Sequence, residues 1–114
     1  MDIKKIVGRF SVLANISLND ASKWFNLCRE SADEIKSQLR EGINEKNYED
    51  RLNAAAAVLS FYKYILCTAS KITSVSITTG TNSAASGIAD RKNMIEAANL
   101  MWKNTRASIS DILK

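Results

Sequence analysis

The sequence predicts a mainly α-helical domain, a bundle of three to four helices with a short β arm or hairpin before the last helix. Three observations lead to this prediction. The 114 residues include no proline, so no proline interrupts a helix. Apolar residues recur at steps of three and four over most of the chain, which is the period of one helix face. One segment instead alternates β-branched and small polar residues, which is typical of a strand.

Length and charge restrict the class of protein further. The length fits one domain, residues 1–114, with a single modest core. Charged residues make up 25% of the chain and the net charge is +4, which excludes a disordered chain and a polycation. The longest uncharged stretch, Ile72–Ala89, is rich in serine and threonine and cannot span a bilayer. We therefore expect no membrane partner.

The first predicted helix runs from Asp2 to Ala14. Its apolar residues fall on one stripe: Ile3, Ile6, Val7, Phe10 and Leu13. Residues 1–15 are therefore expected to form an N-terminal docking helix. Two alternatives remain open, because this stripe can pack on its own domain or dock on a partner protein.

Two longer helices are predicted next. The second helix starts at Ser17, a good cap, and continues to Glu41, after which Gly42 suits a left-handed C-cap. The third returns after a short loop, with Asn47 as its cap, and ends near Ser70. Its apolar surface is wider than one stripe, because Phe61, Tyr64 and Ile65 extend it. Such a helix is central, or it faces a second partner.

The segment Ile72–Thr79 is predicted to be extended, since Val75 and Ile77 alternate with serine and threonine. One strand cannot satisfy its own backbone hydrogen bonds, and the chain offers no good second strand. The segment is therefore either an irregular arm or a strand completed by another chain. An exposed loop follows over Gly80–Gly87, so that arm and loop occupy residues 72–87, and the last helix runs from Ile88 to the end.

The sequence offers no candidate catalytic or metal centre. It contains no histidine, which excludes histidine triads and imidazole ligands. Cys28 and Cys67 lack C-x-x-C spacing, so they are expected to be two free, buried thiols or to form a single bridge. The neighbouring acids Asp33 and Glu34 do not face each other in a helix. We expect no enzyme activity, no cofactor and no metal.

Basic and aromatic residues leave a rival interpretation open. Basic residues lie on the first helix and on the last helix: Lys4, Lys5, Arg9, Arg91, Lys92, Lys103 and Arg106. These clusters are thin, but they keep weak, non-specific nucleic-acid binding as an alternative. Trp24 and Trp102 lie on apolar faces, where they are either core residues or interface anchors.

The order of the predicted helices, extended segment and loop resembles that of a known protein family. A helix over Asp20–Leu39 precedes an alanine-rich helix over Arg51–Tyr64, and the extended Ser74–Ile77 segment and small-residue loop precede a final helix. From about Leu18 to Leu113, this pattern resembles the head–tail connector (adaptor) proteins of tailed bacteriophages and related prophage elements. The first helix lies outside the match. The glycine–aspartate turn that the family often has beside the extended segment is not reproduced, because Thr81 follows Gly80.

The resemblance implies a structural assembly protein of the virion, located at the head–tail junction and in the host cytoplasm during assembly. It implies a ring of about twelve identical subunits, seated between the portal protein and a tail or stopper protein, with DNA passing through the lumen without sequence-specific readout. Candidate subunit or partner interface residues are Phe61, Tyr64, Ile65, Val75, Ile77 and Trp102. The alternatives are another helical protein–protein interaction module and a weak nucleic-acid binder.

Overall fold

A computed structural model describes the backbone of residues 1–79 and 81–114 and the side chains of residues 1–69 and 91–114. Its elements, in chain order, are α1 (Ile3–Ala14), α2 (Leu18–Ser22), α3 (Phe25–Ser37), the 3₁₀ helix η1 (Glu45–Tyr48), α4 (Glu49–Thr79) and α5 (Thr81–Ser108). The predicted mainly α-helical bundle is therefore confirmed.

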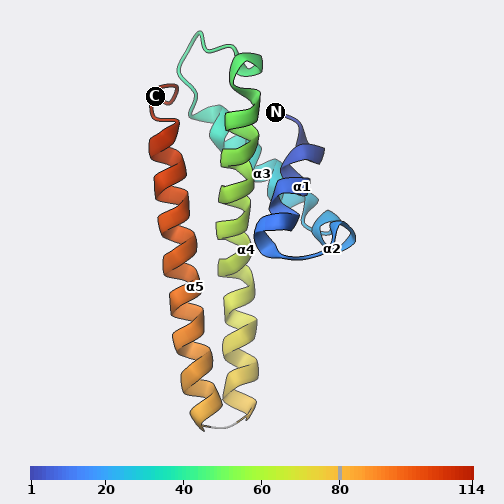
Figure 1. The fold of residues 1–114 in the computed structure, drawn as a ribbon, viewed down its shortest axis with the longest axis vertical. Coiled ribbons are helices and arrows are strands. Elements are labelled where there is room, and N and C mark those ends of the chain that lie inside the picture. Colours follow the sequence, from blue (N-terminus) through green and yellow to red (C-terminus); the bar gives the residue numbers. More distant parts are fainter. Residues whose placement is uncertain (80) are drawn as a thin grey trace.

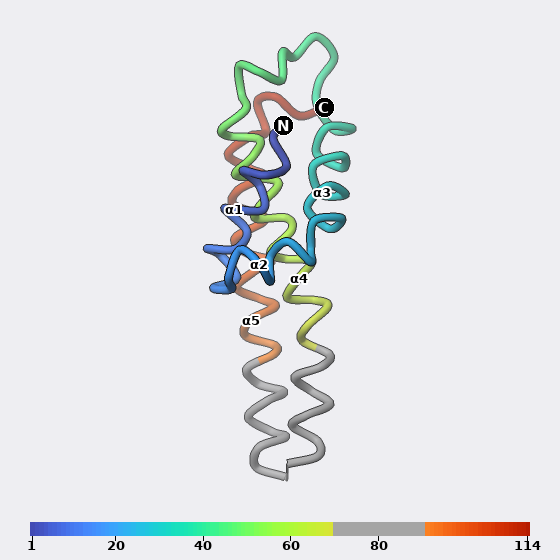
Figure 2. The backbone as a smooth tube through the Cα atoms, turned by 90° about the vertical axis from the view of Figure 1, so that its right-hand side faces the viewer, coloured from blue at the N-terminus to red at the C-terminus, as the bar shows by residue number. Residues whose placement is uncertain are grey.

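The two long helices and the three short ones form two layers. Helices α4 and α5 pair as an antiparallel hairpin, α1 and α3 pack across α4 near the end that carries both termini, and α2 packs on α1 (Figure 1). Seen from the side, α1 and α3 lie on opposite edges of this second layer (Figure 2). The molecule is elongated, 55 × 28 × 18 Å. Helix α4 is thus the central element, because it contacts α1, α3 and α5.

Small residues explain how α4 accepts so many neighbours. The run Ala54–Ala57 removes side-chain bulk, so that other helices approach its backbone closely. Leu52, Ala55 and Ala56 are fully buried. Ser60 is buried too, and its hydroxyl donates to the Ala56 carbonyl at 2.7 Å, so this hydroxyl keeps a hydrogen bond inside the core.

Helix α1 packs on its own domain, which answers the question that its apolar stripe left open. Asp2 caps its start, because the carboxylate accepts hydrogen bonds from the backbone N–H groups of Lys4 (3.0 Å) and Lys5 (3.4 Å). Ile6 and Phe10 are completely buried against the bundle. Asn15 ends the helix in the left-handed conformation with φ +54°.

The predicted continuous helix from Ser17 to Glu41 is wrong, although Ser17 does cap its first turn by accepting from the Asp20 N–H at 3.1 Å. The chain turns between α2 and α3, and Trp24 there places its ring in a T-shaped contact with Tyr64, with centroids 5.0 Å apart. This tertiary contact, which has no signature in the local pattern, orients the turn. Helix α3 also ends earlier than predicted, at Ser37.

The C-terminal segment explains the early end of α3. The Arg40 N–H donates to the Ile112 carbonyl at 2.9 Å, and the Lys114 N–H donates to the Gln38 carbonyl at 2.8 Å. This short antiparallel pairing satisfies backbone groups that would otherwise continue the helix. The predicted C-cap at Gly42 is therefore wrong, since Gly42 lies in the following turn with φ +85°.

The start of α4 also differs from the prediction. Asn44, not Asn47, is the capping residue, because its side chain accepts from the Lys46 N–H at 3.1 Å and opens η1. Arg51 then joins α4 to the end of α5. Its guanidinium donates to the Ser108 carbonyl at 2.6 Å and pairs with Asp111 at 2.8 Å. These contacts close the hairpin at the end where both termini lie.

The predicted extended arm over Ile72–Thr79 and the predicted loop over Gly80–Gly87 are wrong. Helix α4 continues to Thr79 and helix α5 begins at Thr81, while Gly80 lies outside the described residues. The helical penalty of β-branched residues is at most about 0.7 kcal/mol each. A helix satisfies its own N–H and C=O groups, whereas a strand here would have no partner among the described residues. The strand preference of these residues is therefore outweighed by the backbone hydrogen bonds that a helix makes within itself.

Two glycines test the backbone conformations described above, one inside helix α1 and one in the turn after α3. Gly8 lies inside α1 and Gly42 has φ +85°, and a Cβ at either position would meet nothing within 4 Å. We expect Gly8→Ala to stabilise the protein by about 0.5–1 kcal/mol through reduced backbone entropy. Gly42→Ala is its matched control and should destabilise by about 1 kcal/mol, because alanine is strained at positive φ. Urea unfolding measures both changes, and equal effects at the two sites would contradict the account.

Candidate functional site

The predicted interface residues whose side chains the structure describes are covered by the domain to different degrees. Tyr64 is part of the core, where its ring meets Phe10 at a centroid distance of 5.4 Å and also Trp24. Ile65 is buried. Phe61 and Trp102 are half-buried and pack against the core cluster. The side chains of Val75 and Ile77 lie outside the described residues.

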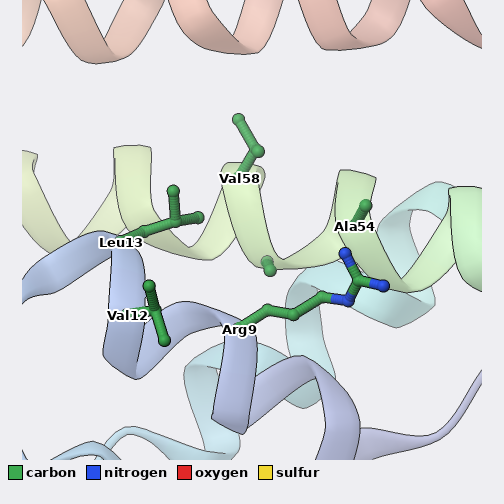
Figure 3. Close-up of a pocket in the computed structure, with 6 residues that line it drawn as sticks. Arg9, Val12, Leu13, Ala54 and Val58 are labelled. Carbon is green, nitrogen blue, oxygen red and sulfur yellow. The ribbon is translucent and has the colours of Figure 1, made fainter.

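A shallow apolar groove lies between α1 and α4. It has a volume of about 290 Å³, and its lining residues are Arg9, Val12, Leu13, Ala54, Ala57 and Val58. Figure 3 shows Val12 and Leu13 on α1, and Ala54 and Val58 on neighbouring turns of α4 with their side chains directed away from α1. Phe61 extends this row, because it follows Ala57 and Val58 by four and three positions and so shares their face of the helix.

Helix α5 packs on α4 and carries an uncharged flank on the side where α1 lies. Ala98 is buried and Trp102 half-buried, four positions apart, so they mark the side that packs on α4. Lys103 and Arg106 lie on the flank toward α3, because they line a hollow with Leu113, which pairs with Leu39 just after α3. The opposite flank therefore turns toward α1.

That opposite flank carries no charged side chain between residues 91 and 108. Its exposed residues are Asn93, Met94, Ala97, Met101, Asn104 and Ser108. We call the combined surface the α1–α4–α5 face. It consists of Val12 and Leu13 on α1, Ala54, Ala57, Val58 and Phe61 on α4, and Met94, Ala97 and Met101 on α5. Of the four predicted interface residues with described side chains, Phe61 alone falls within it.

Val12, Met94 and Met101 were not singled out by the sequence. Val12 lies off the apolar stripe of α1 and is 80% exposed. A signal for the α5 flank was present, because lysines, arginines and glutamate between residues 91 and 108 avoid one side of the helix. Recognising that side as exposed required knowing which stripe packs on α4.

The charged residues are distributed differently on the two sides of the α4–α5 hairpin. On the α1–α4–α5 face, cations occur on α1, where Arg9 lines the groove and Lys5 precedes it by one turn. Neither makes an ion pair with another described residue. The nearest acid along α4 is Asp50, one turn before Ala54.

On the α3 side, an ion-pair network joins α4 to α3. The Lys63 ammonium lies 3.2 Å from Glu30 and 2.8 Å from Glu34, which ties α4 to α3. Burial acts to lower the pKa of Lys63, but the hydrogen bonds to Glu34 and Glu30 outweigh it and raise that pKa. Lys63 and its two glutamates therefore form a paired cluster on this side, whereas Arg9 and Lys5 on the groove side have no such partners among the described residues.

The described residues hold no cluster of three or more metal-ligating side chains. Both cysteines are outside any disulfide, with Cys28 buried as expected and Cys67 exposed, which corrects the prediction of two buried thiols. Burial raises the pKa of the Cys28 thiol, and a hydrogen bond with Ser60 only partly opposes this. A thiol with a raised pKa is a poor nucleophile at neutral pH.

One segment passes a simple test for a membrane span. Residues Glu45–Ala69 are long and apolar enough to cross a bilayer by length and composition alone. Half of the tested window is buried inside the protein, which is the pattern of a core helix covered by its neighbours.

Thiol reactivity tests the placement of the two cysteines. We expect one thiol, Cys67, to react rapidly with Ellman's reagent in the native protein, and Cys28 to react at least about 100-fold more slowly, since it must wait for local opening. Cys67→Ser should remove the fast phase, and Cys28→Ser should leave it. Two fast phases in the native protein would show that Cys28 is not enclosed.

Comparison with known proteins does not assign a role to this face. A scan against protein-family models, a search of curated proteins and a search of solved structures each find no match for this chain. Its role therefore has to be inferred from the shape, exposure and charge of the α1–α4–α5 face.

Proposed function

We propose that this chain is a non-catalytic structural assembly protein that binds other polypeptides through the α1–α4–α5 face. The observation that carries the proposal is the exposure of large apolar side chains there, with Val12 at 80% and Met101 at 38%. Contiguous apolar surface on a soluble domain usually marks an interaction site. Burying one such side chain contributes about 1.5–3 kcal/mol, so a few of them supply useful affinity.

The charge pattern favours a protein partner over nucleic acid. A phosphate-binding surface needs basic residues clustered without acids between them. The groove side offers only Lys5 and Arg9 beside apolar residues. On the other flank of α5, Lys92 lies 4.0 Å from Glu96, so its charge is shared with an acid. Lys103, Arg106 and Lys114 line a hollow with Leu113, and these three cations are a small cluster for a phosphate backbone. The chain therefore suits an apolar partner surface better than a phosphate backbone.

The specific form of this proposal is the connector role that the sequence resemblance implies. In that form, copies of the chain make a ring between the portal and a tail or stopper protein, and DNA passes through the lumen. Because the segment once expected to be a strand is helical, contacts between subunits in this proposal are made by helix faces. Another helical interaction module would use the same face without forming a ring.

A matched pair of α5 variants tests the proposed function. Met101→Glu places a carboxylate on the α1–α4–α5 face, whereas Ala107→Glu places one at an exposed position that borders the hollow on the α3 side. We expect Met101→Glu to weaken association by about tenfold or more, because burying a charge without a partner is costly. Ala107→Glu should associate like the wild type. Light scattering and negative-stain microscopy, with the chain alone and mixed with a portal protein, measure the outcome.

Circular dichroism supplies the folding control for both variants, since each site is exposed and neither should change the helix content. Rings lost only in Met101→Glu would support the connector form. A chain that stays monomeric alone and with portal proteins would contradict that form. Equal association of both variants would contradict the role of the face. Affinity for DNA that falls steeply with salt would favour the nucleic-acid alternative.

A further inference from the structure

The two edges of the groove differ in charge, and this difference limits what can fill it. The α1 edge presents Arg9, which lines the groove, and Lys5 four positions earlier on the same face. Beyond α4, helix α5 presents the uncharged flank around Met94 and Met101. The floor between them is Ala54, Ala57 and Val58. A ligand that matches this surface is apolar in the middle and acidic on one edge only.

The shape of the groove favours a helix as the ligand. Its floor and walls are helices, with apolar positions of α4 spaced at three and four residues, and ridges of a partner helix fit such rows. An amphipathic helix laid into an apolar groove is a common mode of peptide recognition, with anchors at steps of three and four residues. A carboxylate on the partner would reach Arg9, whose planar guanidinium binds carboxylates in a bidentate manner.

We infer that the α1–α4–α5 face binds an amphipathic helix of a different protein, whose apolar stripe is bordered by acidic residues on the edge that meets α1. The inference rests on the proposed function and names the chemistry of the partner. The unpaired state of Arg9 and Lys5 among the described residues carries it, since a cation beside an exposed apolar groove lacks its complement within this part of the chain.

A second copy of the chain does not supply such a helix from its described side chains. The acidic surface of α3 includes Glu30 and Glu34, but both are paired with Lys63. The positions around them, Asn26 and Ser37, are polar, so this surface offers no apolar stripe. Helix α5 has exposed Leu100 beside Glu96, but Glu96 lies 4.0 Å from Lys92, so its charge is already shared with a cation. A foreign helix therefore fits the groove better than self-pairing does.

Two synthetic peptides test the inference. Each has about 18 residues, or five helical turns, with leucines at steps of three and four; one carries glutamates along one edge of the leucine stripe and the other carries lysines there. We expect the glutamate peptide to bind at least about tenfold more tightly at low salt, with a preference that shrinks as salt is added. Fluorescence anisotropy of a labelled peptide gives both dissociation constants.

Charge-reversal variants locate the effect. Arg9→Glu should remove or reverse the preference for the glutamate peptide. Arg29→Glu changes the net charge equally but lies on the exposed side of α3, and it should leave the preference intact. Arg9→Gln keeps the aliphatic stem and should reduce the preference to less than about threefold. These exposed substitutions break no ion pair in the described part of the chain, so folding should be preserved.

The outcomes separate this inference from the proposed function. Equal binding of the two peptides, no saturable binding of either, or a preference that survives Arg9→Glu would overturn the inference. If association of the chain still depended on Met101 in those cases, the proposed function would stand and a second copy would be the occupant of the face. If Met101→Glu had no effect either, both would be wrong.

Discussion

The close packing of α4 is the constraint on which the rest of the structure depends. Its alanine run lets α1, α3 and α5 all approach one helix, and Leu52 and Leu59 of the same helix are buried in the core that these helices enclose. Three neighbours cannot surround a helix completely. Between α4 and α3, the ion pairs of Lys63 with its two glutamates cover the surface of α4. Between α4 and α1, an apolar groove remains open. The candidate site is thus a direct result of how the core is made.

The sequence predicted the mainly helical class, the role of Ser17 as a helix cap and the apolar stripe of α1. These features depend on residues that are close together in the chain. It did not predict the turn at Trp24 or the early end of α3. Both arise from contacts between distant segments: the ring of Trp24 on Tyr64, and the backbone of residues 38–40 on the C-terminal segment. The expected arm over Ile72–Thr79 failed for a related reason. Alternation of β-branched residues indicates a strand only where a second strand is available to pair with it.

The candidate site was predictable only in part. A wide apolar arc on α4 was correctly seen, but the arc mixes residues that other helices cover, such as Tyr64, with residues that stay near the surface, such as Phe61. Periodicity identifies which residues are apolar on a helix and not which neighbour covers them. The contribution of α5 was missed for the same reason. Its uncharged flank can be assigned to the candidate site only when the position of α1 is known. That position depends on the tertiary fold and not on the local sequence of α5.

The contact between Trp24 and Tyr64 has a practical consequence for work on this protein in solution. The indole of Trp24 lies between α2 and α3 and touches a ring on α4, so its ultraviolet signal depends on whether the short helices are seated on the hairpin. Trp102 lies on α5, where its environment depends on the pairing of the two long helices. The molecule therefore carries one intrinsic optical reporter for each layer, and the assembly or loosening of the two layers can be followed separately without an attached label.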